Sequence, residues 1–402
     1  MTGAGELSQT GAEGLVRVLA DEGHVTDPVL REAFERVSRH MFLPERIWID
    51  DDAAEGGYAL VERESSPGRW WQAAYGNEAV VTQMDDGGPD RLDPYWLTPT
   101  SSASQPGVVA RMLAEISLQR DQRVLEIGTG TGFNAALLAE VTGQGNVTTI
   151  EVDPTVCAAA RRALTLAGYE NLTVACGDGE QGYPENAPYD RVLSTASVLA
   201  VPHAWVEQTI EGGRIITPFQ TAFCTHGMVR LTVSGGQASG RFTAPLLFMT
   251  VRGQRRQAGF DALFTDQAWE ESREKDLDAD VSFFDDADAE FAAGLRLPGV
   301  HQGRRAEGRW LCSDDSWAYL DAAKVFQWGP RDLFDEVIAA VAWWYQVGRP
   351  ELSDFGLTIT KDDGQRVWLG DPDGPGWDLP GIRPRSRHAP HWNANTEWSA
   401  SS

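Results

Sequence analysis

Residues 124–140 read VLEIGTGTGFNAALLAE: a short apolar run, three alternating glycines and then a run with helical spacing. Gly128, Gly130 and Gly132 let the backbone approach a ligand closely, and they leave amide donors at the start of a helix. The nicotinamide fingerprint G-x-G-x-x-G is not met, because Phe133 stands where its third glycine is expected. The spacing therefore disfavours a dinucleotide-dependent oxidoreductase.

Acidic residues lie at the ends of three predicted strands around this glycine loop. Glu126 ends the first strand, Glu151 ends the second about 20 residues after the loop, and Asp178 follows the third. We expect the Glu126 carboxylate to point into the cleft, where it would repel phosphate and attract a cationic amino acid. Glu151 is placed to accept hydrogen bonds from two ribose hydroxyls, and Asp178 from an adenine amino group.

A ligand with a ribose, a positive charge and no phosphate fits S-adenosyl-L-methionine. The alternative is a purely structural turn sequence, which leaves the acids at three strand ends unexplained. The predicted cofactor-binding residues are Glu126, Gly128, Thr129, Gly130, Glu151, Asp178 and Gly179.

The surrounding sequence predicts an α/β fold. Short strands rich in Val, Ile and Leu alternate with helical patterns between residues 106 and 230, as in a buried parallel sheet with helices on both faces. The predicted core strands are 123–128, 146–152, 172–177, 189–195 and 213–219. Later elements are expected as strands at 227–233 and 240–251, a helix at 332–348, and a hairpin over 355–370 with Asp363-Gly364 in its turn.

Composition divides the chain into five parts. Helical spacing marks the first, with Asp27-Pro28 as an expected helix start, and glycines, acids and aromatic residues with one or two short strands mark the second. The expected parts are an N-terminal helical segment (1–45), an aromatic-rich insertion (46–97), a cofactor-binding core (98–225), a C-terminal α+β extension expected to recognise substrate (226–370) and a mobile tail (371–402).

The charge of the chain bears on its partners. Its 402 residues include 34 basic and 59 acidic ones, a formal net charge of -25. Such a charge repels a phosphate backbone, so nucleic acid is not expected as a partner. Twelve of the acids lie within 261–290, which is either a solvated surface or a region that steers a basic peptide segment.

The sequence also bears on the compartment. No run of about 20 apolar residues occurs, and the N-terminus lacks the basic and apolar regions of a signal peptide. We therefore expect a cytoplasmic protein that does not bind membranes. Cys157, Cys176, Cys224 and Cys312 lack CxxC spacing, which argues against a zinc site and a disulfide framework and favours reduced, buried thiols.

Residues 98–113, TPTSSASQPGVVARML, carry five hydroxyls before a Gln-Pro pair and a helical run. Ser102 and Ser104 are the candidate catalytic residues, since a hydroxyl can orient a carboxylate without the strong pairing of Lys or Arg. The alternative for Ser104 is helix capping, because Ser before Gln-Pro is typical of an N-cap. His203 is a weaker candidate for a general base, since an ionised carboxylate needs none.

Four stretches carry a family resemblance: SQPGVVARML, VLEIGTGTGFNAALLAE, GYENLTVACGDGEQGYPENAPYDRVLSTAS and VPHAWVEQTIEGGRIITPF. Over about residues 14–220 the chain resembles the protein-L-isoaspartate O-methyltransferase family. The resemblance implies a Rossmann-like class I methyltransferase sheet that uses S-adenosyl-L-methionine. It also implies that Ser102 and Ser104 lie beside the methyl donor and the acceptor carboxylate, and that the acids at 151 and 178 contact the ribose and the adenine.

The chain departs from the repair enzyme of that family, because the family core is about half as long. The TSSASQP stretch, the aromatic insertion and a C-terminal pattern that includes GPRDLFDEV, FGLTIT and DGQRVWL resemble a branch associated with ribosomal peptide biosynthesis, of the ATP-grasp (graspetide), lanthipeptide or imiditide type. That resemblance implies esterification of an encoded aspartate in a precursor peptide. The following backbone amide then attacks the ester, which gives a succinimide (aspartimide) and methanol.

Three functions follow from this sequence. The main hypothesis is an O-methyltransferase for a precursor peptide, acting beside an ATP-grasp ligase or a lanthionine synthetase. Repair of isoaspartyl residues is the alternative. A non-catalytic peptide-binding module is a remote third, which the retained cofactor acids oppose.

Overall fold

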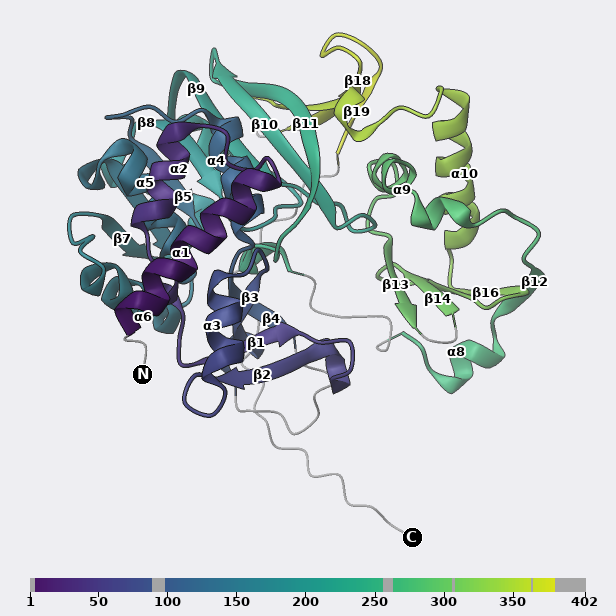
Figure 1. The fold of residues 1–402 in the computed structure, drawn as a ribbon. Helices are drawn as coiled ribbons and strands as arrows, with labels where there is room; N and C mark the ends of the chain where they lie inside the picture. Colours follow the sequence, from purple (N-terminus) through teal and green to yellow (C-terminus); the bar gives the residue numbers. More distant parts are fainter. Residues whose placement is uncertain (1–3, 89–97, 256–262, 306–307, 363, 380–402) are drawn as a thin grey trace.

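The computed structural model in Figure 1 describes residues 4–88, 98–255, 263–305, 308–362 and 364–379. Its centre is a ten-stranded sheet with the order β19-β18-β17-β11-β10-β9-β8-β5-β6-β7. The parallel strands are β5 (Val124–Ile127), β6 (Val147–Glu151), β7 (Thr173–Cys176), β8 (Tyr189–Ser194) and β9 (Thr209–Pro218). The antiparallel strands are β10 (His226–Ser234), β11 (Gln237–Leu247), β17 (Phe355–Ile359), β18 (Gln365–Leu369) and β19 (Gly376–Asp378).

The five predicted core strands are confirmed, and β9 begins earlier than predicted. Strand β5 pairs in parallel with β6 on one side and with β8 on the other. The chain therefore winds outward from β5 in both directions, and such a reversal opens a crevice at the carboxyl ends of the strands. The glycine loop follows β5 at this point.

Helices cover both faces of the sheet, as the sequence predicts. On one face α1 (Ala4–Asp21), α2 (Pro28–Arg36), α4 (Pro106–Ile116), α5 (Phe133–Thr142) and α6 (Pro154–Leu166) share a core with Val124. The next residue, Leu125, faces the other way and belongs to a second core, which also contains residues of α7 (His203–Glu207) and of two helices of the C-terminal extension. Asp27 starts α2 as expected, since its carboxylate accepts from the Val29 amide at 2.8 Å. Within the described ranges, no helix has the length and apolar character needed to cross a bilayer.

The aromatic-rich insertion forms a small layer of its own beside the sheet (Figure 1). It contains three strands, where the sequence predicts one or two, and a helix: β1 (Arg46–Asp50), β2 (Tyr58–Glu62), α3 (Pro67–Tyr75) and β3 (Val80–Met84). They join β4 (Pro99–Ala103), the strand of the hydroxyl-rich segment, in the order β2-β1-β3-β4. Trp70 is fully buried in this layer. Tyr95 and Trp96, also part of the predicted insertion, lie outside the described residues.

The C-terminal extension has two parts. One is a five-stranded sheet, order β12-β16-β15-β14-β13, with three helices. Its elements are α8 (Asp266–Glu270), β12 (Arg273–Asp276), α9 (Ala287–Gly294), β13 (His301–Arg305), β14 (Gly308–Cys312), β15 (Trp317–Leu320), β16 (Lys324–Trp328) and α10 (Leu333–Gln346). The other part, β17 to β19, returns to the central sheet. That sheet therefore contains strands from both sides of residue 225, the predicted end of the cofactor-binding core. The five-part division itself stays a prediction, and residues 380–402 of the predicted tail lie outside the described residues.

Two cysteines are bonded. Cys157 in α6 and Cys176 at the end of β7 form a disulfide with Cα atoms 5.9 Å apart. The prediction of reduced, buried thiols is wrong for this pair, and it is confirmed for Cys224 and Cys312, which are buried thiols. Sequence spacing misses the bond because α6 returns beside β7. Disulfides are rare in reducing compartments, so this bond is at odds with the predicted cytoplasmic location.

A fully buried arginine joins the insertion to β4. The two terminal nitrogens of the Arg39 guanidinium donate to six backbone carbonyls at 2.9 to 3.3 Å, namely those of Ala73, Ala74, Gly76, Glu78, Ala103 and Ser104. Burial lowers the pKa of Arg39 to about 10. Because a buried carbonyl without a donor costs free energy, this one side chain holds two segments in a single arrangement.

We expect Arg39→Lys to lower the free energy of unfolding by roughly 3 kcal/mol, because an ammonium offers three donors where six carbonyls need them. Urea denaturation measures the change. Arg36→Lys is the control, since Arg36 pairs with Glu32 and Glu140 at the surface and its replacement should cost about 0.5 kcal/mol or less. Equal losses in the two variants would contradict the role given to Arg39.

Candidate functional site

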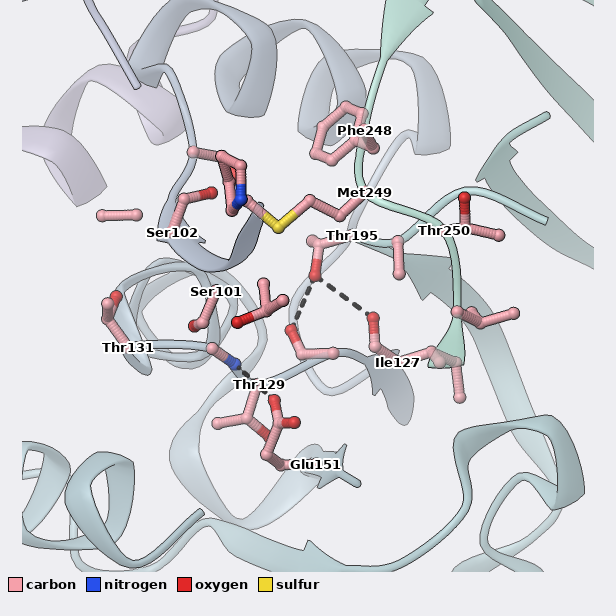
Figure 2. A pocket seen from close by; sticks show the side chains of 18 of the residues that line it. Ser101, Ser102, Ile127, Thr129, Thr131, Glu151, Thr195, Phe248, Met249 and Thr250 are labelled. Carbon is pink, nitrogen blue, oxygen red and sulfur yellow. Dashed lines mark hydrogen bonds between the residues drawn. The ribbon is translucent and has the colours of Figure 1, made fainter. Parts of the chain in front are cut away.

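A cavity of about 490 Å³ opens at the carboxyl ends of β5, β6 and β8. Much of its wall comes from three segments: the hydroxyl-rich strand β4, the glycine loop, and the chain from Leu247 to Arg255 that follows β11. In Figure 2, Ser101 and Ser102 lie on one side of the loop that carries Thr129, and Glu151 lies on the opposite side. The cavity is therefore at the crevice that the strand order predicts.

The glycine loop brings backbone to the wall of the cavity. Gly128 and Gly130 have positive φ angles of 90° and 53°. A Cβ atom at Gly128 would lie 2.9 Å from Thr195 Oγ1, whose hydroxyl donates to the Gly128 carbonyl at 2.6 Å. A Cβ at Gly130 would lie 3.3 Å from the Ser102 carbonyl. The loop thus passes directly between β8 and β4, and only glycine gives it that room.

Glu151 is the last residue of β6 and lines the cavity. One carboxylate oxygen accepts from the Gly130 amide at 2.9 Å and the other from the Asp153 amide at 3.0 Å. Burial raises the pKa of Glu151, while these two hydrogen bonds act in the opposite direction. Each oxygen keeps further acceptor capacity, so the held carboxylate can also bind two hydroxyls of a ribose.

Glu126 does not lie where the sequence predicts. It is fully buried and is not among the residues that line the cavity. Its carboxylate accepts from Asn134 Nδ2 at 2.6 Å and from the Thr149 hydroxyl at 2.5 Å. The expectation of a carboxylate pointing into the cleft is therefore corrected: side chains alternate along a strand, so Glu126 shares the face of Val124 and points toward α5.

Asn134 takes the place on the cavity wall that was expected of Glu126. It is the second residue of α5 and lines the cavity. Because its Nδ2 is held by Glu126, its Oδ1 is left as an acceptor, and this buried atom has no hydrogen-bond partner among the described residues. An orphaned acceptor in a cavity fits the ammonium group of an amino acid. Glu126 thus orients the side chain of Asn134, a residue of the cavity wall that the sequence analysis missed.

Of the two candidate catalytic serines, Ser102 lies in β4 and Ser104 directly follows that strand. Ser102 and Ser104 are both half-buried and line the cavity. The N-cap of α4 is Gln105, whose side chain makes no capping bond, so helix capping does not account for Ser104. Thr100 and Ser101 instead bond within the insertion, to Gln83 and Thr82.

Asp178 and Gly179 also line the cavity, next to Glu151. The Asp178 carboxylate accepts from the Glu180 amide at 3.0 Å, and so it starts the short helical turn Gly179–Gln181. Of the nine predicted site residues, the structure brings eight to one cavity and leaves only Glu126 behind its wall. Their assigned roles stay predictions.

The sequence analysis also missed an ionic cluster at the rim. Arg252 contacts Asp86 at 2.8 Å and Asp153 at 3.1 Å, and Arg255 contacts Asp86 at 2.9 Å. These contacts join the insertion, the ribose side of the cavity and the segment after β11. Of the residues in this cluster, only Asp153 lies in a recognisable sequence pattern, because Asp before Pro after a predicted strand is typical of a helix start. The arginines lie far along the chain and gave no signal.

Burial raises the pKa of Glu126 to about 7, against the effect of its bonds from Thr149 and Asn134. Between its ordinary value near 4.5 and this value, the folded carboxyl holds a proton that the unfolded chain has lost. The free energy of unfolding therefore falls as the pH rises through this window.

We expect Glu126→Gln, which imitates the protonated carboxyl, to gain stability relative to the wild type between pH 5 and pH 8, by up to roughly 3 kcal/mol. Urea denaturation at several pH values measures this gain. The exposed Glu170→Gln is the control and should show no such trend. If the free energies of unfolding of Glu126→Gln and wild type differed by the same amount at every pH, the raised pKa of Glu126 would be contradicted.

The parallel sheet, the glycine loop and the acid at the end of β6 are those of a Rossmann-like class I methyltransferase. The family model for protein-L-isoaspartate(D-aspartate) O-methyltransferase (PCMT) matches residues 89–256. A protein-L-isoaspartate O-methyltransferase of Ignicoccus hospitalis is 32% identical over 207 residues, which is 51% of this chain and 80% of that protein. A protein-L-isoaspartate O-methyltransferase 1 of Nitrosospira multiformis is 36% identical over 199 residues, 45% of this chain and 83% of that one.

The chain belongs to the protein-L-isoaspartate O-methyltransferase family. The predicted class, an S-adenosyl-L-methionine-dependent carboxyl methyltransferase, is thereby confirmed. A solved protein-L-isoaspartate O-methyltransferase also shares the fold, with a TM-score of 0.52 at 21% identity, and covers 90% of this chain and all of its own. The fold of that protein therefore extends over much of the C-terminal extension as well as the core.

Proposed function

We propose that the chain transfers the methyl group of S-adenosyl-L-methionine to the carboxylate of an isoaspartyl residue in peptides. The observation that supports this proposal most is that Ser102 and Ser104 line the same cavity as Glu151 and the glycine loop. Hydroxyl donors and cofactor-binding groups thus face one space. Ser104 does not cap the helix, which leaves its side chain available to a ligand.

Methyl transfer to an ionised carboxylate requires that the reacting groups be oriented, and it requires no proton transfer. S-adenosyl-L-methionine supplies an activated methyl group. The acceptor carboxylate forms a C–O bond while the methyl–sulfur bond breaks, and no proton moves, so a general base is not needed. Ser102 and Ser104 would hold the carboxylate in line, and alignment of this kind is worth roughly 7 to 11 kcal/mol. His203, which pairs with Glu207 on α7, does not line the cavity.

The comparisons support an isoaspartyl acceptor over an encoded aspartate. The relatives in Ignicoccus and Nitrosospira, both protein-L-isoaspartate O-methyltransferases, match at 80% or more of their own length. The C-terminal extension, which contributed to the resemblance to peptide-biosynthetic enzymes, has a counterpart in the fold of a solved protein-L-isoaspartate O-methyltransferase. It therefore does not by itself favour a biosynthetic role.

A second candidate is esterification of an encoded aspartate in a ribosomal precursor peptide, with a succinimide as the later product. One observation favours it: Asp50 and Tyr58, which lie before the part matched by the family model, line the cavity. The acceptor side of this cavity is thus partly built from the insertion. Under this candidate, the acidic region 261–290 would steer a basic segment of the peptide, and an ATP-grasp ligase or lanthionine synthetase would act beside the enzyme in the cytoplasm.

Two peptides of one sequence, with isoaspartate or aspartate at a single position, separate the candidates. We expect methyl transfer from S-adenosyl-L-methionine, followed by mass spectrometry, to be at least about 100-fold faster on the isoaspartyl peptide, a difference of ~2.7 kcal/mol in the barrier. Faster methylation or dehydration of the aspartyl peptide, or of a precursor peptide encoded beside this chain, would favour the second candidate. No methylation of any of these peptides would contradict both.

Ser104→Ala should lower kcat about 10- to 100-fold, since a hydrogen bond to a charged carboxylate is worth roughly 1.5 to 3 kcal/mol. The dissociation constant for S-adenosyl-L-homocysteine, measured by calorimetry, should stay within about twofold of wild type. Ser353→Ala, at an exposed position, is the control and should change neither quantity. An equal loss of kcat and of cofactor affinity in Ser104→Ala would contradict a role at the acceptor.

A further inference from the structure

A group of potential metal ligands lies outside the methyl-transfer cavity. Cys224 and His226 lie at the turn from β9 into β10, and Glu290 lies on α9 of the C-terminal extension. One ligand atom of each residue, namely a sulfur, a ring nitrogen and a carboxylate oxygen, lies within 4.8 Å of the other two. Segments distant in sequence are thus brought together with three different ligand types.

The orientation of His226 leaves one ring nitrogen as an acceptor. Its Nε2 lies 3.1 Å from the Ala287 carbonyl, which can only accept, so Nε2 carries the proton. In the neutral ring Nδ1 then has a lone pair, and it faces a Glu290 carboxylate oxygen at 3.6 Å. Both atoms are ligand types for a metal ion, and with the Cys224 sulfur they form one cluster. A ring NH held by a carbonyl is also the usual support of a metal-binding histidine.

Glu290, like His226, is oriented by a hydrogen bond on the side away from the proposed site. Its other carboxylate oxygen accepts from Gln302 Nε2, which also donates to the Phe223 carbonyl at 3.0 Å. The amide oxygen of Gln302 accepts from Arg309 at 2.6 Å. A chain of hydrogen bonds therefore orients the carboxylate and leaves one oxygen toward His226, as in the outer shell of a metal site.

The position of Cys224 is fixed by its turn. The Thr221 hydroxyl accepts from the Cys224 amide at 2.9 Å, and the Cys224 carbonyl accepts from the Thr221 amide at 2.8 Å. Helix α9 packs closely on this turn at Gly294, where a Cβ atom would lie 2.5 Å from Thr221 Oγ1 and 2.9 Å from Cys224 Cβ. The thiol is fully buried at the contact between α9 and the central sheet, and its S–H donates to the His226 carbonyl at 3.3 Å, so zinc would replace that proton.

We propose that Cys224 Sγ, His226 Nδ1 and a Glu290 carboxylate oxygen bind one Zn²⁺ ion. Thiolate, imidazole and carboxylate are the ligands that zinc takes in tetrahedral sites, and three protein ligands leave one position for water. A thiolate and a carboxylate also balance the two charges of the ion. The half-buried His226 and Glu290 side chains, 17% and 21% exposed, give the ion a path from solvent.

The proposed ion would join the extension to the methyl-transfer cavity. The turn that holds Cys224 begins after β9, where the Gln220 amide donates to the Val198 carbonyl at 2.9 Å. The side chain of Gln220 donates to the Thr250 hydroxyl, and Thr250 lines the cavity. Zinc at the turn would therefore fix α9 and one wall of the cavity in the same arrangement.

The test is the zinc content and zinc affinity of the full chain. After dialysis against Zn²⁺ and removal of excess, we expect about one zinc per chain by mass spectrometry of the metal. Cys224→Ser and His226→Gln should each lower the affinity by more than tenfold, and Gln302→Ala by about 10- to 100-fold through the loosened carboxylate. Cobalt in place of zinc should show a thiolate-to-cobalt charge-transfer band that Cys224→Ser abolishes.

Two further measurements separate a site from a folding effect. Cys312→Ser, at the other buried thiol, should keep the zinc and the cobalt band. Zinc should raise Tm of the wild type but not of His226→Gln. Absence of bound zinc in the wild type, or full retention of zinc in Cys224→Ser and His226→Gln, would overturn the proposal.

Discussion

The buried guanidinium of Arg39 is the constraint on which the wall of the cavity that carries Ser102 and Ser104 depends. A charge in the interior must be satisfied by hydrogen bonds, and here every acceptor is a backbone carbonyl. Those carbonyls belong to the end of α3, the chain before β3, and the end of β4. The insertion, although a separate layer, is therefore tied to the rest of the molecule through this side chain. Its geometry and that of the serine strand are set by one and the same side chain.

The sheet and its crevice could be predicted from sequence because their signals are local. Each buried strand is a short run of branched apolar residues, and the strands alternate with helical patterns, so a parallel sheet with a cleft at its carboxyl edge could be predicted, whereas the strand order came from the structure. The insertion gave weaker signals, since its strands are short and half exposed. Arg39 gave none, because bonds to backbone carbonyls leave no pattern in the residues that accept them. The same holds for Gln302 and Arg309 behind Glu290.

Glu126 and Glu151 show that a sequence pattern does not determine which side chain at a strand end faces the cavity. Both were expected to contact the cofactor because both come at strand ends. Glu151 is the last residue of its strand and reaches the edge of the sheet, whereas Glu126 precedes the last residue of β5 and points beneath α5. One residue of register therefore separates a cavity wall from a buried support. The Cys157–Cys176 disulfide was missed for a related reason, since it depends on the return of α6 beside β7 and not on the spacing of the cysteines.

The pairing of β11 with β17 has a consequence for how the chain can change. Arg241 in β11 pairs with Gly356 in β17, so the chain that leaves the sheet after Leu247 returns to it along the same strand, β11. Insertions and deletions in the surface loops of this segment leave the paired strands in place, whereas its first part, Leu247 to Arg255, is tied to the wall of the cavity. The parallel strands that carry the glycine loop lie farther along the sheet and take no part in that segment. In such an architecture the C-terminal extension can diverge while the strands that carry the glycine loop stay the same.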